Sequence, residues 1–171
     1  MVGESNYAEC VVKRKSRATD SLLKGLLVFG VLALGFFATI TGGLLQLLAL
    51  FLTIGMFFFA MYQWSRFNVE YEYIFVDGQI DFDAVYSGTS RKHLKRIDME
   101  KTEVVAKPDS SALDGYKHLN LKPTDYTSGA DSDKVYAIIV KGEKCQEEIL
   151  FEPDENFLQY MKKKSPRKVM L

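Results

Sequence analysis

An uncharged stretch of 41 residues, between Lys24 and Arg66, constrains this chain more than any other feature. The hydrocarbon core of a bilayer is roughly 30 Å thick, and one helix of about 20 residues can cross it. A single helix made of the whole stretch would be about 60 Å long, at roughly 1.5 Å per residue, and would leave apolar surface in water. The stretch therefore predicts two membrane-spanning helices.

A break between the two helices is visible at Thr39-Ile40-Thr41-Gly42-Gly43, where paired glycines permit a tight turn. We expect the first helix near Leu22–Ile40 and the second near Leu44–Trp64. Apart from Lys24 at the edge of the first span, neither span contains a charged residue, whereas ion and proton pathways through membranes usually need one. The hairpin is therefore predicted to be an anchor and not a transport path.

The flanks of the hairpin predict its orientation. Basic residues precede the first helix and one follows the second: Lys13, Arg14, Lys15, Arg17, Lys24 and Arg66. Because cationic residues near helix ends stay on the cytoplasmic side, we expect a multi-pass protein of the plasma membrane with both termini cytoplasmic. Interface positions are Lys24, Tyr62, Trp64 and Arg66. A cleaved signal peptide is the alternative, but the apolar region is too long and lacks a convincing cleavage site.

The two-helix interpretation divides the chain into a basic cytoplasmic tail (1–21), the hairpin (22–64) and a soluble domain (66–171). The clearest local signal in the domain is Asp77-Gly78, a pair typical of two-residue β-turns because both positions need positive φ. With that turn, Tyr73 faces Phe82 and Phe75 faces Ile80, which places the apolar side chains on one face. A β-hairpin is predicted here.

The rest of the domain predicts more strands and one helix. Further strands are expected at Arg91–Ile97, Lys101–Lys107, Tyr116–Leu121, Val135–Val140 and Glu147–Phe151. Residues 108–133, rich in Ser, Asp and Gly, predict a long surface excursion whose role the sequence does not reveal. After Pro153, the stripe of Phe157, Leu158 and Met161 predicts an amphipathic helix. The fold class is α+β: a transmembrane helical hairpin, then six or seven antiparallel strands closed by a C-terminal helix.

This arrangement resembles bacterial pleckstrin-homology-like membrane proteins. A narrower similarity, to a family of small two-helix membrane proteins of Gram-positive anaerobic bacteria, rests on five internal motifs and the C-terminal Pro166-Arg-Lys-Val169. The motifs are Val69-Glu-Tyr-Glu-Tyr73, Asp77-Gly-Gln-Ile-Asp81, Arg91-Lys-His-Leu94, Tyr126-Thr-Ser-Gly129 and Ile149-Leu-Phe-Glu-Pro153. The resemblance implies a pleckstrin-like β domain and no particular activity.

Three carboxylates should gather on the outer face of the first β-hairpin: Glu72, Asp81 and Asp83. Like charges that face each other are unfavourable unless something neutralises them. A divalent cation is one neutraliser. The next strand offers another, because Arg91, His93 and Lys95 alternate onto one face, and we favour these ion pairs over a metal site.

Two basic clusters are the candidate binding residues: Arg91, Lys92, Lys95 and Arg96, and Lys162, Lys163, Lys164, Arg167 and Lys168. Beside an anionic leaflet each basic side chain contributes roughly 1 kcal/mol of attraction. The clusters therefore suit lipid head groups or a protein partner. A solvated face, balanced by nearby carboxylates, is the alternative.

No catalytic or cofactor-binding motif is present in the sequence. It has no phosphate-binding glycine loop, no nucleophile elbow and no Cys/His metal-ligand spacing, and Cys10 and Cys145 lie far apart. From Arg66 onward 17 basic residues balance 19 acidic ones, which argues against nucleic acid. We expect a non-enzymatic membrane-anchored adaptor that has no cofactor, metal or small-molecule substrate. The alternative is a scaffold subunit of a larger membrane complex.

Overall fold

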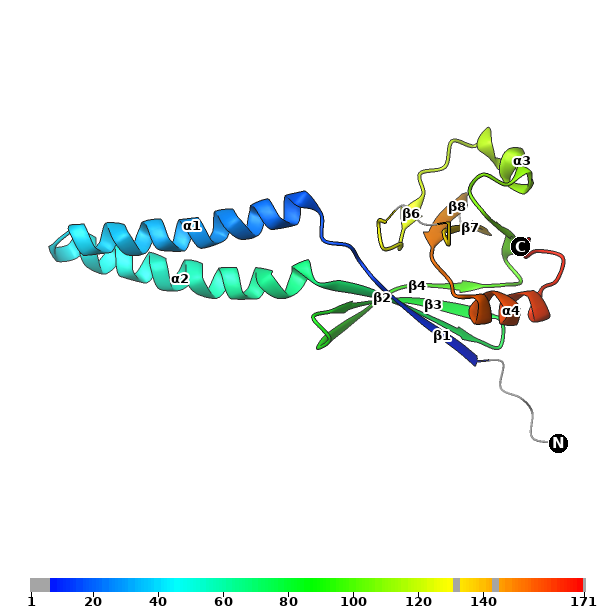
Figure 1. Cartoon of the computed structure of the whole chain (residues 1–171), viewed down its shortest axis with the longest axis horizontal. Coiled ribbons are helices and arrows are strands. Elements are labelled where there is room, and N and C mark those ends of the chain that lie inside the picture. The colour runs from blue at the N-terminus through cyan, green and yellow to red at the C-terminus, as the bar shows by residue number, and fades with distance from the viewer. Residues whose placement is uncertain (1–6, 131–132, 143–144, 171) are drawn as a thin grey trace. The chain divides into compact units, whose positions relative to one another are not determined.

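The structure is a computed structural model that describes residues 7–130, 133–142 and 145–170, except for the side chain of Ser65. The chain forms two compact units (Figure 1). One comprises Ser16–Val69, and the other comprises Met1–Lys15 together with Glu70–Leu171. The second unit is therefore assembled from both sides of the first in sequence.

The unit Ser16–Val69 is a helical hairpin made of α1 (Ala18–Ile40) and α2 (Gly43–Phe67). Each helix contains a segment long and apolar enough, by length and composition, to cross a membrane. The turn lies where the sequence predicted it, and Gly43 takes a φ of +62° there. Helix α1 starts four residues before the predicted Leu22, because the Asp20 side chain accepts a hydrogen bond from the Arg17 amide (3.1 Å) and caps an earlier turn.

The surface of the hairpin is apolar along both helices. Phe29 of α1 and Phe51 of α2 are 72% and 74% exposed, and leucines and phenylalanines throughout the hairpin are similarly open. A soluble protein rarely exposes an apolar surface of this extent. A hairpin with this surface suits the interior of a lipid bilayer.

The first sheet of the β unit contains β1 (Tyr7–Lys13), β2 (Val69–Val76), β3 (Gln79–Tyr86) and β4 (Ser90–Asp98), in that order. Strand β1 corrects our prediction of a basic tail over residues 1–21. It pairs antiparallel with β2 along its whole length, with Ala8 opposite Phe75. The alternation of exposed and buried side chains in β1 is short and adjoins the basic residues, so the sequence alone does not reveal a strand there. Hydrogen bonding to β2 stabilises it as a strand.

The turn between β2 and β3 is the predicted Asp77-Gly78 pair, and both residues have positive φ (49° and 94°). The rings of Tyr73 and Phe82, predicted to face each other, lie 5.5 Å apart between centroids. The predicted β-hairpin is therefore present, with its apolar side chains in the core.

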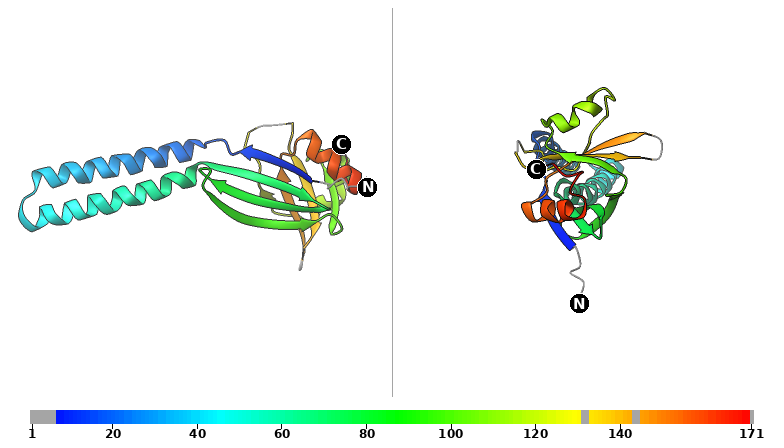
Figure 2. Two further views of the ribbon diagram at one scale, coloured as in Figure 1. Left: turned by 90° about the horizontal axis from the view of Figure 1, so that it is seen from below. Right: turned by 90° about the vertical axis from the view of Figure 1, so that its right-hand side faces the viewer.

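The second sheet contains β5 (Thr102–Ala106), β7 (Tyr136–Lys141), β8 (Gln146–Phe151) and the two-residue β6 (Thr124–Asp125). Its order is β5-β7-β8-β6. Most neighbours are antiparallel, as predicted, but β6 runs parallel to β8, and Val169 forms a parallel bridge with Val105 at the other edge. Figure 2 shows the β7–β8 hairpin crossing the strands of the first sheet at a steep angle.

The core lies between the two sheets and is closed by α4 (Glu155–Lys164). Asp154 caps this helix by accepting a hydrogen bond from the Phe157 amide (2.7 Å). The predicted stripe of Phe157, Leu158 and Met161 is buried in the core against side chains of both sheets. The predicted α+β architecture is confirmed, with eight strands among the described residues where six or seven were predicted.

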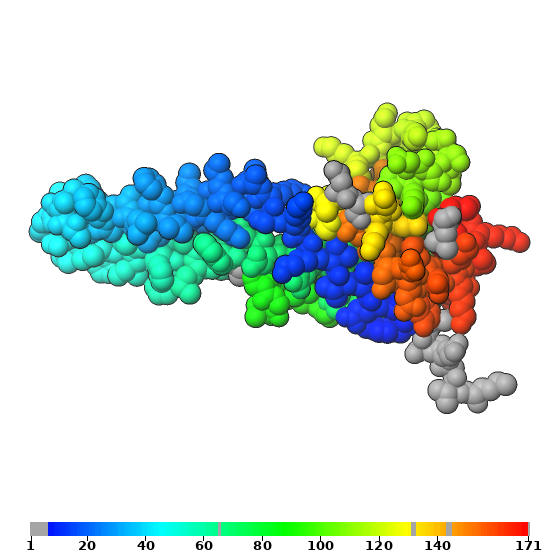
Figure 3. Space-filling view, viewed as in Figure 1, coloured from blue at the N-terminus to red at the C-terminus, as the bar shows by residue number. Residues whose placement is uncertain are grey.

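The excursion between β5 and β7 covers the outer face of the second sheet. The predicted strand Tyr116–Leu121 was wrong: a 3-10 turn, η1 (Ser111–Leu113), and a helical turn, α3 (Asp114–Lys117), precede an irregular segment. Leu113 packs with Val104, Ala106, Ala137 and Ile139 in a second apolar cluster. Figure 3 shows this region as a protruding lobe of the β unit. Strand β7 is consequently buried on both faces, which explains its continuous apolar run.

Candidate functional site

The outer face of the first sheet carries a network of ion pairs. Arg91 of β4 contacts Glu72 and lies 3.8 Å from Asp83, and the His93 ring nitrogen Nδ1 lies 2.8 Å from an Asp83 oxygen. Glu72 and Asp83 are buried, at 6% and 8% exposure. These contacts agree with the ion-pair alternative. Among the described residues, no group of three or more His, Cys, Asp or Glu is placed to hold a metal ion.

A β-bulge changes which basic residues reach this face. Phe82 pairs with Lys95 and the next residue, Asp83, pairs with His93, so that Leu94 is the extra residue on β4. The bulge reverses the alternation, and Lys95 does not join Arg91 and His93 as we expected. Arg96 takes the outer position, where its guanidinium contacts both carboxylate oxygens of Asp81 (2.5 and 2.8 Å).

The buried end of the network contains a pair of interacting carboxyl groups. Burial, together with the neighbouring Glu9 carboxyl, raises the pKa of Glu72 above its ordinary value. A hydrogen bond from the Tyr7 hydroxyl, and the contact with Glu72, lower the pKa of Glu9. The pKa values of the two carboxyl groups are therefore shifted in opposite directions, and burial makes ionised Glu72 the costlier of the two, which Arg91 offsets.

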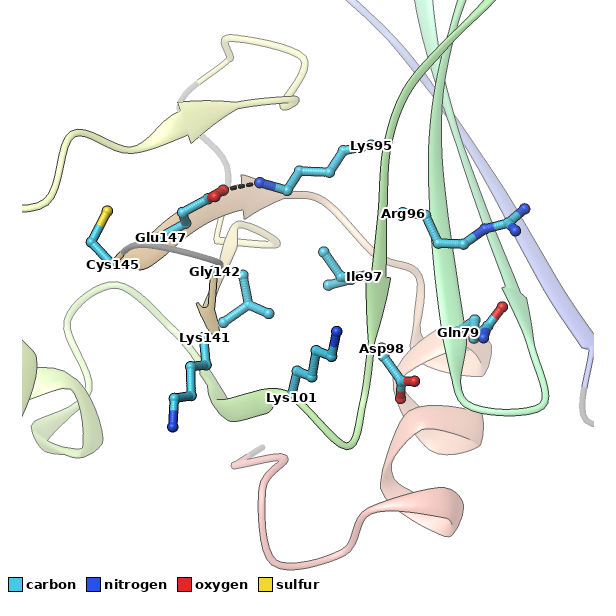
Figure 4. Close-up of a pocket in the computed structure, with 11 residues that line it drawn as sticks. Gln79, Lys95, Arg96, Ile97, Asp98, Lys101, Lys141, Gly142, Cys145 and Glu147 are labelled. Carbon is cyan, nitrogen blue, oxygen red and sulfur yellow. Dashed lines mark ion pairs between the residues drawn. The ribbon is translucent and has the colours of Figure 1, made fainter.

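A pocket of about 970 Å³ lies on the other side of β4, between this strand and the end of the β7–β8 hairpin. Its lining includes the buried side chains of Ile97 and Val140. The lining also holds four cationic residues (Lys95, Arg96, Lys101 and Lys141) and two carboxylates (Asp98 and Glu147). Figure 4 shows Lys95, Ile97 and Lys101 pointing into the space, with Arg96 on the opposite side of β4. The pocket is apolar at its floor and basic overall.

Lys95 is the most enclosed cation of this pocket. Its side chain is 28% exposed and forms an ion pair with Glu147 of β8. Burial lowers the pKa of Lys95. On the far wall, the Lys141 amide donates to the Lys101 carbonyl (3.0 Å), which holds the end of β7 against the start of β5. Sequence analysis missed Lys101 and Lys141, because no sequence signal links residues from separate strands.

The structure disperses the first predicted basic cluster. Arg91 and Arg96 are paired on the outer face, Lys95 turns to the pocket, and Lys92 is exposed. In the second cluster, Lys162 to Lys164 form the last turn of α4, and Arg167 follows it. The Lys168 ammonium donates to the carbonyls of Met99 and Glu100 (2.7 and 2.8 Å). Arg91, Lys95, Arg96 and Lys168 therefore already have partners within the domain.

The four predicted membrane-interface residues gather at one end of the hairpin. The Lys24 ammonium lies over the Trp64 ring (5.5 Å to the centroid), and the Arg66 guanidinium lies over the Tyr62 ring (4.8 Å). Cation–π contacts of this kind join an amphipathic ring to a charge, a combination typical of the membrane–water boundary.

The segment from Tyr126 to Gly129 closes the two sheets on the side of β1. The Tyr126 ring packs on Tyr71 and Phe82, at centroid distances of 5.7 and 5.2 Å. The Lys15 amide donates to the Ser128 carbonyl (2.7 Å), and the Ser128 hydroxyl donates to Glu152 (2.8 Å). This loop has a structural role at the seam, and the pocket lies at the opposite edge of the first sheet.

Two sheets enclosing one core, closed by a C-terminal helix and joined in sequence to an apolar helical hairpin, define a membrane-associated β domain. The chain matches the family described as "Bacterial PH-like domain (DUF6106)" over residues 4–171, and it belongs to that family. The predicted pleckstrin-homology-like fold is thereby confirmed. Neither curated proteins nor solved structures show a significant match.

Proposed function

We propose that this protein is a non-enzymatic adaptor, anchored in the plasma membrane by α1 and α2, whose β domain binds a protein partner in the cytoplasm. One observation carries the proposed anchoring: β1 and β2, which flank the hairpin in sequence, pair with each other over Tyr7–Val76 to Lys13–Glu70. Two strands of one sheet occupy one compartment. The hairpin must then cross the membrane twice and return to the side from which it started.

The basic flanks give this arrangement its direction. The turn at Thr41-Gly42 has no charge, whereas Arg66 lies in the last turn of α2 and four basic residues precede α1: Lys13, Arg14, Lys15 and Arg17. Cytoplasmic retention of these cations orients the domain and both termini inward.

Thiol labelling in intact cells tests the topology. Cys145 is exposed on the β domain, and Gly42→Cys adds a thiol at the hairpin turn in a Cys145→Ser background. A membrane-impermeant maleimide should label the turn thiol in intact cells and Cys145 only after permeabilisation. Labelling of Cys145 from outside would contradict the proposed orientation.

A protein partner is favoured over lipid head groups because several of the basic residues already contact other groups of the domain. Arg91, Arg96 and Lys168 already satisfy carboxylates or carbonyls of the domain, which reduces the charge that remains for an anionic leaflet. Co-sedimentation of the full-length protein in nanodiscs with neutral and anionic vesicles separates the two ligands. Strong preference for anionic vesicles would move the assignment to lipid binding.

Crosslinking in native membranes tests the adaptor role itself. A partner that exchanges on dilution supports an adaptor. A stoichiometric companion that persists through detergent purification would instead support the scaffold subunit.

A further inference from the structure

We infer that the pocket beside β4 binds a short, extended, acidic segment of a partner protein, added as a strand to the free edge of the first sheet. This inference rests on the proposed adaptor function and names the part of the domain that would carry it. Three independent features of the pocket support it: an open strand edge, an apolar floor, and two lysines that have no ion-pair partner among the described residues.

The first feature is the edge of β4. This strand is the last in its sheet, with β3 on one side and the pocket on the other. The Met99 amide donates to the Gly78 carbonyl (2.8 Å), which extends the ladder beyond Ile80–Ile97. Because hydrogen-bonded positions alternate in an antiparallel pair, the main-chain groups of Ile97 and Lys95 point to β3, and those of Arg96 point to the pocket side.

The second feature is the floor. Ile97 and Val140 are each 4% exposed in the whole chain, yet both line the pocket. An apolar side chain of a bound segment would contact them, while its main chain bonds to the edge. Main-chain bonds for affinity and side-chain contacts for specificity are the features of recognition by strand addition.

The third feature selects the charge of the ligand. Among the residues that the structure describes, neither Lys101 nor Lys141 has an ion-pair partner, while Lys95 is paired with Glu147. Lys101 precedes β5 and Lys141 ends β7, so both ammonium groups lie across the pocket from β4, where they repel a basic segment and attract carboxylates. The bulge at Leu94 ends the regular edge on one side. On the other side, the Asp98 carbonyl already accepts from the Lys101 amide (3.0 Å), which closes the edge there. The bound segment is therefore short and centred on Arg96.

The test uses full-length protein in nanodiscs of neutral lipid and fluorescence anisotropy of labelled, end-blocked hexapeptides. The binding probe alternates valine and glutamate, and a matched probe carries lysine in place of glutamate. We expect only the acidic probe to bind. Lys101→Glu and Lys141→Glu should each weaken it by about tenfold or more, equivalent to about 1.4 kcal/mol. Lys92→Glu, at an exposed position, and Lys162→Glu, at a half-buried one, both lie outside the pocket and should change it by less than about twofold.

Two further probes separate strand addition from simple attraction of charge. An acidic probe with N-methylated valines cannot donate main-chain hydrogen bonds, so its binding should be lost. Inorganic phosphate should not displace the acidic probe at millimolar concentration.

The inference is overturned by any of four results: no binding of the acidic probe, equal loss in all four lysine variants, full binding of the N-methylated probe, or displacement by phosphate. The last would identify a small-anion site. Crosslinking in native membranes separates failure of this inference from failure of the adaptor function. If Lys101→Glu still crosslinks to the partner of the wild type, the adaptor function holds and the partner binds elsewhere on the domain. If the wild type has no partner, the adaptor function itself fails.

Discussion

Cys10 and Tyr73 are register partners in adjacent strands, although the whole helical hairpin lies between them in sequence. The Cys10 thiol also contacts the Glu152 carbonyl (3.6 Å), and the Glu152 amide donates to the Tyr73 hydroxyl (3.4 Å). The segment before the hairpin is thus built into the core of the domain that follows it. Folding of this domain requires both ends of the hairpin to meet.

Ala8→Asp tests the contribution of β1 to the core. Ala8 is 5% exposed and packs in the main cluster, so an unpaired carboxylate there should destabilise the domain by about 3 kcal/mol or more. Thermal unfolding of the detergent-solubilised protein measures the effect. Val11→Asp, on the exposed face of the same strand, is the matched control and should shift the midpoint little. Equal effects of the two variants would show that β1 does not pack as described.

Tyr73→Phe tests the buried hydroxyl that joins the two sheets. The hydroxyl donates to the Tyr126 carbonyl and accepts from the Glu152 amide, so its removal should cost about 1–3 kcal/mol in the free energy of unfolding. Tyr7→Phe, at an exposed position, is the control and should cost less. Denaturant unfolding compares them, and a smaller loss at Tyr73 than at Tyr7 would contradict the bonding scheme.

The loss of stability in Tyr73→Phe should also depend on pH. Burial raises the pKa of Tyr73 above the ordinary value of 10.0, so the unfolded chain releases this proton first. The stability contributed by the group is fully present below pH 10 and declines as the pH rises above it. The difference between wild type and Tyr73→Phe should therefore narrow above pH 10, and a constant difference would argue against this burial.

Arg91→Gln tests the charge network on the outer face. Arg91 neutralises buried Glu72, whose raised pKa means that the folded state holds its proton more tightly than the unfolded state does. The contribution of Glu72 is thus present below its ordinary value of 4.5 and is lost as the pH rises through the folded value. Without Arg91 that loss is larger, so the variant should be destabilised by about 1 kcal/mol at pH 7 and by less near pH 4.

Unfolding titrations across this pH range provide the measurement. Lys92→Gln, the exposed neighbour, is the control and should show no pH-dependent difference from wild type. A deficit in Arg91→Gln that is equal at both pH values would mean that the arginine acts by packing alone.

Leu113→Ala tests the cover on the second sheet. Leu113 is 6% exposed in the outer cluster, and the substitution should cost about 2–3 kcal/mol through lost burial and a residual cavity. Amide hydrogen exchange should become faster in β5, β7 and the excursion. Leu119→Ala removes the same atoms from a half-buried residue outside both clusters and should have little effect. Unchanged exchange in β5 would show that the lobe does not protect the sheet.

Gly30→Leu tests the packing within the hairpin. A Cβ atom at Gly30 would collide with the end of the flexible Met56 side chain, whereas a Cβ at Gly25 would meet nothing within 4 Å. Gly30→Ala should be tolerated because Met56 can rotate away. Gly30→Leu should separate the helices and lower the thermal midpoint more than Gly25→Leu does. Equal midpoints for the two leucine variants would contradict this contact.

Several parts of this protein follow from local sequence. The uncharged stretch specifies two apolar helices because it exceeds one bilayer crossing, and Asp77-Gly78 specifies a hairpin because both residues accept positive φ. Asp154 and the apolar stripe after it specify α4 by capping and periodicity. These signals act over a few residues, where propensity and spacing decide the outcome.

Other parts depended on contacts between distant residues. Tyr7–Lys13 is a strand because β2 offers it a partner, and the outer carboxylates are neutralised as they are because a bulge at Leu94 exchanges Lys95 for Arg96. The pocket exists because Lys101 and Lys141, from separate strands, are held beside β4. Pairing register and the meeting of strand edges are properties of the assembled sheets, so only the tertiary structure could decide them.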